Sequence, residues 1–374
     1  MTRHIRPRLL FIKGNGNRGD SIYKRKQSTE WTLMRIILVG WGVVGQSFAQ
    51  IITSRKGELA RKYGFRPRIV AIVDKKGAAI NPKGLDLEQM LTLKKEKGTV
   101  SASSQHGHPG MSALETIESV EAEAMVEVTP TNIETAEPGL SYIKAAFRTG
   151  KNVVTTNKGP LALALPALTE LADYNKVYLR FSGTVGAGTP ILEFAKNCLQ
   201  GDRIVSIRGI LNGTTNYILS QMDEKHITFD EALKEAQALG YAEADPTMDV
   251  DGYDAAAKLV IMANWIMDKK VTIKDVKIRG IRDVSAQNIE AASAKGCTIK
   301  LIGSIEETLK VEPTQIAKHD PLAVDGALNA VTFVSESAGE QTIIGLGAGG
   351  TETASAVLRD LLDIKQNIAN KMIT

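Results

Sequence analysis

A glycine-rich turn at residues 40–45, with the sequence GWGVVG, constrains the fold of this chain more than any other feature. The short apolar run 35–39 precedes the turn, and residues 44–53 follow it with the apolar spacing of a helix. In such a strand–turn–helix unit the first glycine permits the tight turn, the second lets the backbone approach a pyrophosphate, and the third lets helix and strand pack closely. The helix N-terminus then offers free N–H groups to phosphate. The motif predicts a Rossmann-type dinucleotide-binding domain, with Gly40, Gly42 and Gly45 along the cofactor.

Further short apolar strands predict that this first part of the chain is a parallel sheet covered by helices. They lie at 68–73, 124–128 and 152–155, and helical segments separate them. We expect the dinucleotide-binding domain to span residues 34–160 and to be completed by about 330–374, where a second glycine turn and an amphipathic helix occur at 346–362. The polar segment 82–109 has the composition of a loop-rich insertion.

Residues 161–330 change character and predict a second, mixed α/β domain. Strand candidates in this part and just beyond it are 176–181, 204–211, 298–305, 309–315, 330–335 and 342–346, and a long helix is expected at 254–267. Closely spaced strands joined by turn residues favour an antiparallel or mixed sheet. The fold class is therefore α/β, with two sheets.

The charge distribution separates the first 33 residues from the rest. The whole chain carries a net +4, but residues 1–33 hold eight Lys/Arg and two acids, which leaves residues 34–374 at −2. We expect 1–33 to be a disordered basic extension or a start placed too far upstream, with a targeting or anion-binding tail as the alternative. The slightly acidic body gives no nucleic-acid footprint, and no apolar run is long enough for a membrane span. Two cysteines, Cys198 and Cys297, without a CxxC pair, favour a reducing, cytoplasmic setting.

The residues that end the second strand leave the cofactor open between NAD and NADP. Asp74 lies 29 residues after Gly45, a longer spacing than the usual ~20, and an acid there favours the ribose 2′-hydroxyl of NAD. Lys75 and Lys76 follow at once and could meet the 2′-phosphate of NADP.

Two lysines are candidates for chemistry. Lys258 is four residues after Asp254 on an otherwise apolar helix, so the pair shares one face, either as a surface salt bridge or within a cleft. Lys158 directly follows the strand 152–155, where parallel sheets bind ligands, although a solvated turn lysine is equally consistent with this position. A calcium loop at 247–258 fails because it begins with threonine and ends with lysine, and no HExxH or Cys/His cluster indicates catalytic zinc.

Several motifs, taken in order, resemble those of homoserine dehydrogenases from residue 34 to the C-terminal helix. Besides GWGVVG they are VTPTN (128–132), TTNKGPLA (155–162), SGTVGAGTPIL (182–192), GILNGTTNYIL (209–219), GYAEADPTMDVDGYDAAAKL (240–259), HDPLAVDGALNAV (319–331) and GLGAGGTETASAV (345–357). The resemblance implies NAD(P)-dependent interconversion of L-homoserine and L-aspartate 4-semialdehyde, on the route to threonine and methionine. It also implies a homodimer formed through the second, catalytic domain.

The resemblance also implies roles for particular residues. Lys258 would be the proton donor and acceptor, Lys158 a second catalytic or substrate-holding lysine, and Glu243 and Asp254 would bind homoserine. Val43, Val44, Thr129, Lys158, Gly240 and Gly349 would line the cofactor together with the glycines of the first turn. An amino-acid dehydrogenase acting on aspartate and a non-catalytic dinucleotide sensor are the alternatives.

Two departures from the family pattern affect metal binding and regulation. Relatives often bind a monovalent cation such as sodium through backbone carbonyls, here matched by Val185, Ala187 and Thr189, but Ser182 stands where a glutamate is usual. The chain ends after the GAGG helix, so we expect no small-molecule-sensing domain and no threonine feedback through one.

Overall fold

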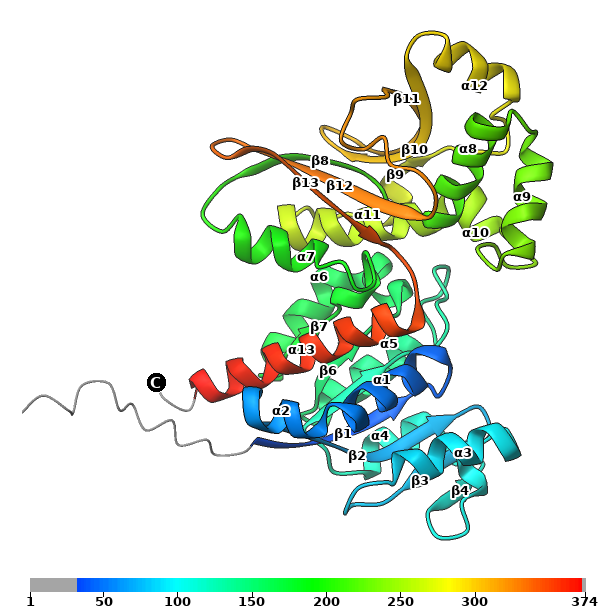
Figure 1. The fold of residues 1–374 in the computed structure, drawn as a ribbon. Coiled ribbons are helices and arrows are strands. Elements are labelled where there is room, and N and C mark those ends of the chain that lie inside the picture. Colours follow the sequence, from blue (N-terminus) through cyan, green and yellow to red (C-terminus); the bar gives the residue numbers. More distant parts are fainter. Residues whose placement is uncertain (1–31, 372–374) are drawn as a thin grey trace, which may run out of the picture.

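The computed structural model describes residues 32–371 and contains two β-sheets with helices between and around them (Figure 1). The first is a seven-stranded sheet in the order β4-β3-β2-β1-β5-β6-β7. Its strands are β1 (Thr32–Val39), β2 (Phe65–Asp74), β3 (Gly77–Ile80), β4 (Gly107–Pro109), β5 (Ala124–Glu127), β6 (Asn152–Thr155) and β7 (Leu179–Arg180). Strands β2, β1, β5, β6 and β7 are parallel, whereas β3 and β4 form an antiparallel edge. The parallel sheet expected from the sequence is confirmed.

Strand β1 shows how the sequence alternation builds two apolar layers. Ile36 and Leu38 join a cluster with helices α1 (Val43–Ser54) and α13 (Gly350–Lys371) on one face. Ile37 and Val39 join a second cluster with helices α4 (Ala113–Ser119), α5 (Gly139–Arg148) and α6 (Lys158–Tyr174) on the other. Successive side chains of a strand point to opposite faces, so the apolar run buries both sides of the sheet. Because β1 begins at Thr32, residues 32–33 are not part of an extension; the rest of the predicted extension, 1–31, lies outside the described residues.

The second sheet has six strands in the order β13-β12-β8-β10-β11-β9. They are β8 (Ile204–Ile210), β9 (Val276–Ile278), β10 (Cys297–Ile305), β11 (Leu309–Ala317), β12 (Leu328–Ser335) and β13 (Gly339–Leu346). The pairs are antiparallel except for β9 with β11, so the mixed sheet expected from the sequence is confirmed. The remaining helices are α2 (Lys56–Tyr63), α3 (Leu87–Lys97), α7 (Ile191–Glu193), α8 (Gly213–Lys225), α9 (Phe229–Ala238), α10 (Thr247–Val250), α11 (Tyr253–Met267) and α12 (Ala286–Ser293).

Helices α6 and α11 pack on each other between the two sheets (Figure 1). Every residue of α11 from Asp254 to Asn264 is buried, which explains why its sequence is apolar on all sides. The chain then returns to the first sheet, where α13 packs beside α1 (Figure 1). This arrangement places the N-terminal ends of α6 and α11 close together.

The insertion at 82–109 is more ordered than its composition indicates, and the prediction of a loop-rich segment is wrong. It contains α3, which begins after Asp86 and ends at Gly98 in the left-handed conformation, and the edge strand β4. The Asp86 side chain accepts hydrogen bonds from the amides of Glu88 and Gln89, as an N-cap does. Leu87, Met90 and Leu91 have the i, i+3, i+4 spacing of a helix and pack toward the core, so this helix could have been recognised from the sequence.

Candidate active site

A buried carboxylate holds two lysines where α6 meets α11. The Lys258 ammonium lies 2.8 Å from Oδ2 of Asp254, one helical turn earlier on α11, and donates to the Leu211 carbonyl at 2.7 Å. The Lys158 ammonium, at the first residue of α6, lies 3.3 Å from Oδ1 of the same carboxylate. Asp254 and Lys258 are only 8% and 6% exposed. The arrangement is a buried cluster and not the surface salt bridge that the sequence left open.

The two ammonium groups keep Asp254 ionised. Burial on its own would raise the pKa of this carboxyl, but the charges of Lys258 and Lys158 outweigh it and hold the pKa well below its usual range. A negative charge on Asp254 therefore persists at neutral pH and fixes both lysines.

Two residues that the sequence did not single out complete the cluster. Asn212 donates to Asp249 at 2.6 Å and to Asp254 at 2.9 Å, while its side-chain oxygen accepts from the Thr215 amide and caps α8. Burial, followed by the nearby charge of Asp254, raises the pKa of Asp249. The NGT triplet after a strand is the signal for such a cap, but nothing in the sequence shows that its amide reaches α11.

Glu243 and Gly240 lie in the loop between α9 and α10. Gly240 has φ +78°, and the loop is joined to α8 by a hydrogen bond from Thr214 to the Tyr241 carbonyl at 2.7 Å. The Glu243 side chain is exposed, and within residues 32–371 its carboxylate has no hydrogen bond or ion pair with the lysine cluster. The structure thus brings Lys158, Asp254 and Lys258 together and leaves Glu243 at the rim.

The first glycine turn has the geometry that a pyrophosphate requires. Gly40 has φ +107°, and a Cβ there would lie 2.7 Å from the Val128 carbonyl oxygen, while a Cβ on Gly45 would collide with the Gly40 carbonyl. A Cβ on Gly42 would meet no atom of the described residues within 4 Å, and Val43 beside it is 73% exposed. Close packing against neighbouring backbone therefore explains why residues 40 and 45 are glycine. The space beside Gly42 is open, as it must be if a dinucleotide is to lie there.

The second glycine turn lies against the first. Gly349 has φ +133° directly before α13, and a Cβ on Gly350 would collide with the Val43 side chain. Thr129 follows β5 and Lys158 follows β6, so both lie at the carboxyl edge of the sheet, the edge from which the first glycine turn leaves β1. Residues from four distant segments of the chain thus meet along one edge.

Asp74 faces the insertion. Oδ1 accepts from the Lys76 amide at 3.0 Å and the Thr99 hydroxyl at 2.8 Å, and Oδ2 accepts from the Lys94 ammonium at 3.1 Å and the Val100 amide at 3.0 Å. Burial opposes ionisation here, but these donors lower the pKa of Asp74. Both oxygens are engaged by the protein, so the carboxylate is less available to a ribose hydroxyl than its position in the sequence indicates.

The turn 182–189 does not fit the monovalent cation expected at Val185, Ala187 and Thr189. The Arg359 guanidinium donates to the Gly188 carbonyl at 3.2 Å and to the Ser182 hydroxyl at 3.4 Å. The Thr189 carbonyl already accepts from the Ile191 amide at 2.8 Å. The Arg359 guanidinium also lies 3.8 Å from the Glu193 carboxylate, so it already supplies a positive charge at the turn where the cation is expected. In the described part of the chain, no group of three His, Cys, Asp or Glu side chains could hold a metal ion.

Enzyme activity should therefore be insensitive to the type of monovalent cation. Replacing sodium with choline at constant ionic strength is expected to change kcat by less than about twofold, because Arg359 supplies the charge at the turn. Initial rates in the two salts measure this, and a large loss in choline that sodium restores would show that the turn does bind an ion.

Asp360, on α13 beside this turn, should make the protein less stable as the pH rises. Burial and the nearby charge of Glu193 raise its pKa to about 7, far above the ~3.9 of an unfolded aspartate. The folded state therefore holds a proton that the unfolded state has released, and stability falls from about pH 4 to pH 7. We expect Asp360→Asn to melt higher than the parent protein at pH 8.5, with a smaller difference at pH 5.5. Equal differences at both values would contradict this assignment.

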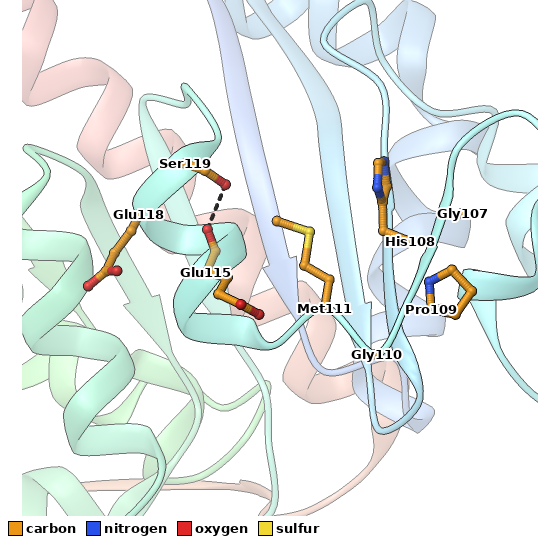
Figure 2. Close-up of a pocket in the computed structure, with 8 residues that line it drawn as sticks. All are labelled: Gly107, His108, Pro109, Gly110, Met111, Glu115, Glu118 and Ser119. Carbon is orange, nitrogen blue, oxygen red and sulfur yellow. Dashed lines mark hydrogen bonds between the residues drawn. The ribbon is translucent and has the colours of Figure 1, made fainter.

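A shallow depression of about 890 Å³ lies away from the lysine cluster, between β4 and α4 (Figure 2). Figure 2 shows Met111 and His108 on one side and the α4 residues Glu115, Glu118 and Ser119 on the other. Glu115 forms the capping box of α4 with Ser112, and the Ser119 hydroxyl donates to the Glu115 carbonyl at 2.6 Å. The hydrogen bonds of Glu115 and Ser119 therefore stabilise α4 itself. Among residues 32–371, no helix is long and apolar enough to cross a membrane.

The comparisons with known proteins agree with this geometry. A family model of homoserine dehydrogenase matches residues 190–362, and a model of Glutamate/Leucine/Phenylalanine/Valine dehydrogenase matches residues 18–137. The chain is 45% identical over 332 residues to a homoserine dehydrogenase of Methanocaldococcus jannaschii, covering 88% of this chain and 98% of the relative. It is 41% identical over 350 residues to an NAD(+)-dependent homoserine dehydrogenase of Pseudomonas canavaninivorans, covering 91% and 98%.

Solved structures give the same result. A homoserine dehydrogenase from Thiobacillus denitrificans superposes with a TM-score of 0.79 at 30% identity, covering 91% of this chain and 74% of the other. A hyperthermophilic archaeal homoserine dehydrogenase in complex with NADPH gives a TM-score of 0.79 at 29% identity, covering 90% and 98%. With relatives this similar along nearly their whole length, the chain belongs to the homoserine dehydrogenase family.

Proposed function

We propose that the protein interconverts L-homoserine and L-aspartate 4-semialdehyde with NAD(P), on the route to threonine and methionine. The observation that carries this proposal is the Lys158–Asp254–Lys258 cluster, at the edge of the sheet where the two glycine turns meet. Oxidation of an alcohol requires a hydride acceptor and a proton acceptor. The nicotinamide, when bound, exchanges the hydride with C4 of the substrate.

Lys258 is the proposed proton acceptor and donor. Of the three N–H bonds of its ammonium, one faces Asp254 and one faces the Leu211 carbonyl, which leaves the third for the substrate oxygen. In semialdehyde reduction the Lys258 ammonium gives one proton to the carbonyl oxygen as C4 gains the hydride. Homoserine oxidation is the reverse: Lys258 first releases a proton to solvent, and the amine then takes the hydroxyl proton as C4 loses the hydride.

The surrounding residues hold the substrate and the lysines. Lys158 lies on the other oxygen of Asp254 and places a second positive charge where negative charge develops on the substrate oxygen. Glu243, at the rim, would pair with the homoserine ammonium, and Asp254 would orient the reacting end.

The proposed cofactor site runs along the carboxyl edge of the first sheet, in a dinucleotide-binding domain of residues 34–160 completed by about 330–374. In that last segment β12 and β13 pair in the six-stranded sheet, and α13 is the part that packs on the first sheet. The pyrophosphate would lie over Gly42 and the α1 N-terminus, and Thr129, Lys158, Gly240 and Gly349 would line the remainder. Residues 161–330 would form the catalytic and dimerisation domain of a cytoplasmic homodimer. Ile344 and Leu346 on edge strand β13 are 49% and 50% exposed, which supports such pairing and can be checked from the mass in solution.

Substitutions at the second and third glycines of the turn should separate an effect on cofactor binding from an effect on folding. Gly42→Ala should keep the melting temperature and weaken NADPH binding about tenfold or more, because the added methyl group occupies the phosphate position. Gly45→Ala should instead lower stability by ~2 kcal/mol or more, because its Cβ collides with the Gly40 carbonyl. NADPH fluorescence titration and thermal melting of both variants test this. Unchanged NADPH affinity in Gly42→Ala would place the pyrophosphate elsewhere.

A substrate panel tests the reaction itself. Homoserine, aspartate and threonine are each supplied with NADP+ and with NAD+, and reduced cofactor is followed by absorbance. We expect reduction with homoserine only. Reduction with aspartate alone would indicate an aspartate dehydrogenase, and cofactor binding without turnover of any substrate would indicate a sensor.

A further inference from the structure

A buried carboxylate that the proposed chemistry does not use lies next to the lysine cluster. Glu127 is the last residue of β5, between Val39 of β1 and Thr155 of β6, and its side chain has no solvent exposure. It therefore lies inside the sheet at the carboxyl edge where cofactor and substrate are proposed to meet.

In the described part of the chain, the polar groups that contact this carboxylate are hydrogen-bond donors. The Thr155 hydroxyl donates to Oε2 at 2.6 Å, the Thr129 amide donates to Oε1 at 2.9 Å, and the Thr129 hydroxyl also donates to Oε1. Within residues 32–371 no lysine, arginine or histidine forms an ion pair with it. Burial raises the pKa of Glu127, whereas these donors oppose the rise. An acid buried without a cation is costly, so its retention calls for a specific role.

The hydrogen bonds continue from Glu127 to the start of α6. The Thr155 hydroxyl accepts from the Asn157 amide at 3.0 Å, and the Asn157 side chain caps α6 by accepting from the Gly159 amide at 3.1 Å. The Asn157 amide group also donates to the Thr129 hydroxyl at 3.4 Å and to the Pro130 carbonyl at 3.3 Å. Lys158 lies between the two residues held in this way, and its ammonium reaches Asp254.

We propose that Glu127 is a positioning residue that holds Lys158 and the Thr129 loop in one fixed arrangement, so that the catalytic lysine and the cofactor are aligned together. The proposal rests on the function proposed above. It predicts that shape alone is insufficient at this position. Glutamine keeps the size of the side chain but has only one acceptor oxygen. With that oxygen on the Thr129 amide, its N–H₂ group faces the Thr155 hydroxyl, which must then turn its own proton away and lose the hydrogen bond that it donates to residue 127. Aspartate keeps the charge but is one methylene too short to reach Thr129 and Thr155 together.

A double-mutant cycle with Lys158 tests the proposal. Glu127→Gln should lower kcat about tenfold or more in the parent protein, since small misplacements of catalytic groups cost this much. In the Lys158→Ala background the same change should lower kcat less than about twofold, because the group being positioned is absent. Glu127→Asp should recover part of the loss. If Glu127→Gln fails to fold, Thr155→Val removes one donor from the same carboxylate and takes its place in the cycle.

Asp360→Asn is the matched control, because it also converts a buried acid to an amide but lies on α13, outside the cluster. It should leave kcat and NADPH affinity within about twofold. The NADPH dissociation constant, measured by fluorescence titration, is a second measurement that does not require the enzyme to turn over substrate. It should rise several-fold in Glu127→Gln, because Thr129 is released.

Three results overturn the proposal: an equal loss of kcat from Glu127→Gln in both backgrounds, parent values of kcat and NADPH affinity in Glu127→Gln, or no effect of Lys158→Ala on kcat. Failure of the proposed function looks different, since the parent protein would then not turn over homoserine. In that case the NADPH measurement decides alone: weaker binding in Glu127→Gln with normal binding in Asp360→Asn supports the positioning of Thr129, and equal binding in all three proteins refutes it.

Discussion

Lys258→Met is expected to lower kcat for homoserine oxidation by about 10³-fold, because the variant has no group to accept the hydroxyl proton. Methionine fills most of the lysine volume, so the buried α11 should keep its packing. The NADPH dissociation constant should stay near the parent value, since Lys258 meets the substrate. Initial rates at saturating cofactor, together with a fluorescence titration, measure both quantities.

Lys300→Met is the matched control for this prediction. Lys300, on β10 of the six-stranded sheet, is also buried, at 1% exposure. Its ammonium lies 3.0 Å from the Ser220 hydroxyl and 3.0 Å from the Asp325 carboxylate. Losing this ammonium should leave kcat within about twofold, since the group takes no part in the transition state. Near-parental turnover in Lys258→Met would remove that lysine from the mechanism.

Asp254→Asn should reduce both activity and stability. The change leaves two ammonium groups near one neutral amide in a buried site, and breaking a buried charge pair in this way typically costs ~3–5 kcal/mol. Lys158 and Lys258 would also separate, so kcat/KM for homoserine should fall about 100-fold or more. Thermal melting and initial rates test the two effects.

The stability difference between the parent protein and Asp254→Asn should change with pH in a definite direction. Because the folded-state pKa of Asp254 lies below its unfolded value of ~3.9, its stabilisation is present above that value and is lost as the pH falls below it. The melting difference between the parent protein and Asp254→Asn should therefore be large at pH 7 and shrink toward pH 3. Asp251→Asn breaks an exposed pair with Arg282 and should change stability by less than ~1 kcal/mol. A difference that grows in acid would contradict the proposed charge state.

Short patterns of neighbouring residues in the sequence predicted several strands of the first sheet and one ion pair of the candidate site. Apolar runs gave β1, β2, β5 and β6, and the i, i+4 spacing placed Lys258 beside Asp254. Neither pattern shows which distant segments meet. The bridge from Lys158 to Asp254 depends on the packing of α6 on α11, ninety-six residues apart in sequence, and only resemblance to a family connected the two.

The sequence also did not predict which groups the side chains of Asp74 and Arg359 contact. Asp74 ends β2 as expected, but Lys94 and Thr99 from a helix-containing insertion donate hydrogen bonds to its carboxylate, which leaves it less available to a ribose. Arg359 reaches the turn 182–189 from α13, more than 170 residues later, so its effect on a cation was not visible in the local motif. In both cases a polar contact from a distant part of the chain determines whether a group can still bind a ligand: the Asp74 carboxylate in the first case, and the carbonyl groups of the turn 182–189 in the second.

The most direct test of the central claim is to give the purified protein L-aspartate 4-semialdehyde with NADPH and, in parallel, with NADH. We expect cofactor oxidation that depends on the semialdehyde, with one homoserine formed for each cofactor oxidised, as measured by amino-acid chromatography. A folded protein that binds NADPH but oxidises neither cofactor, or that oxidises one without forming homoserine, would contradict it.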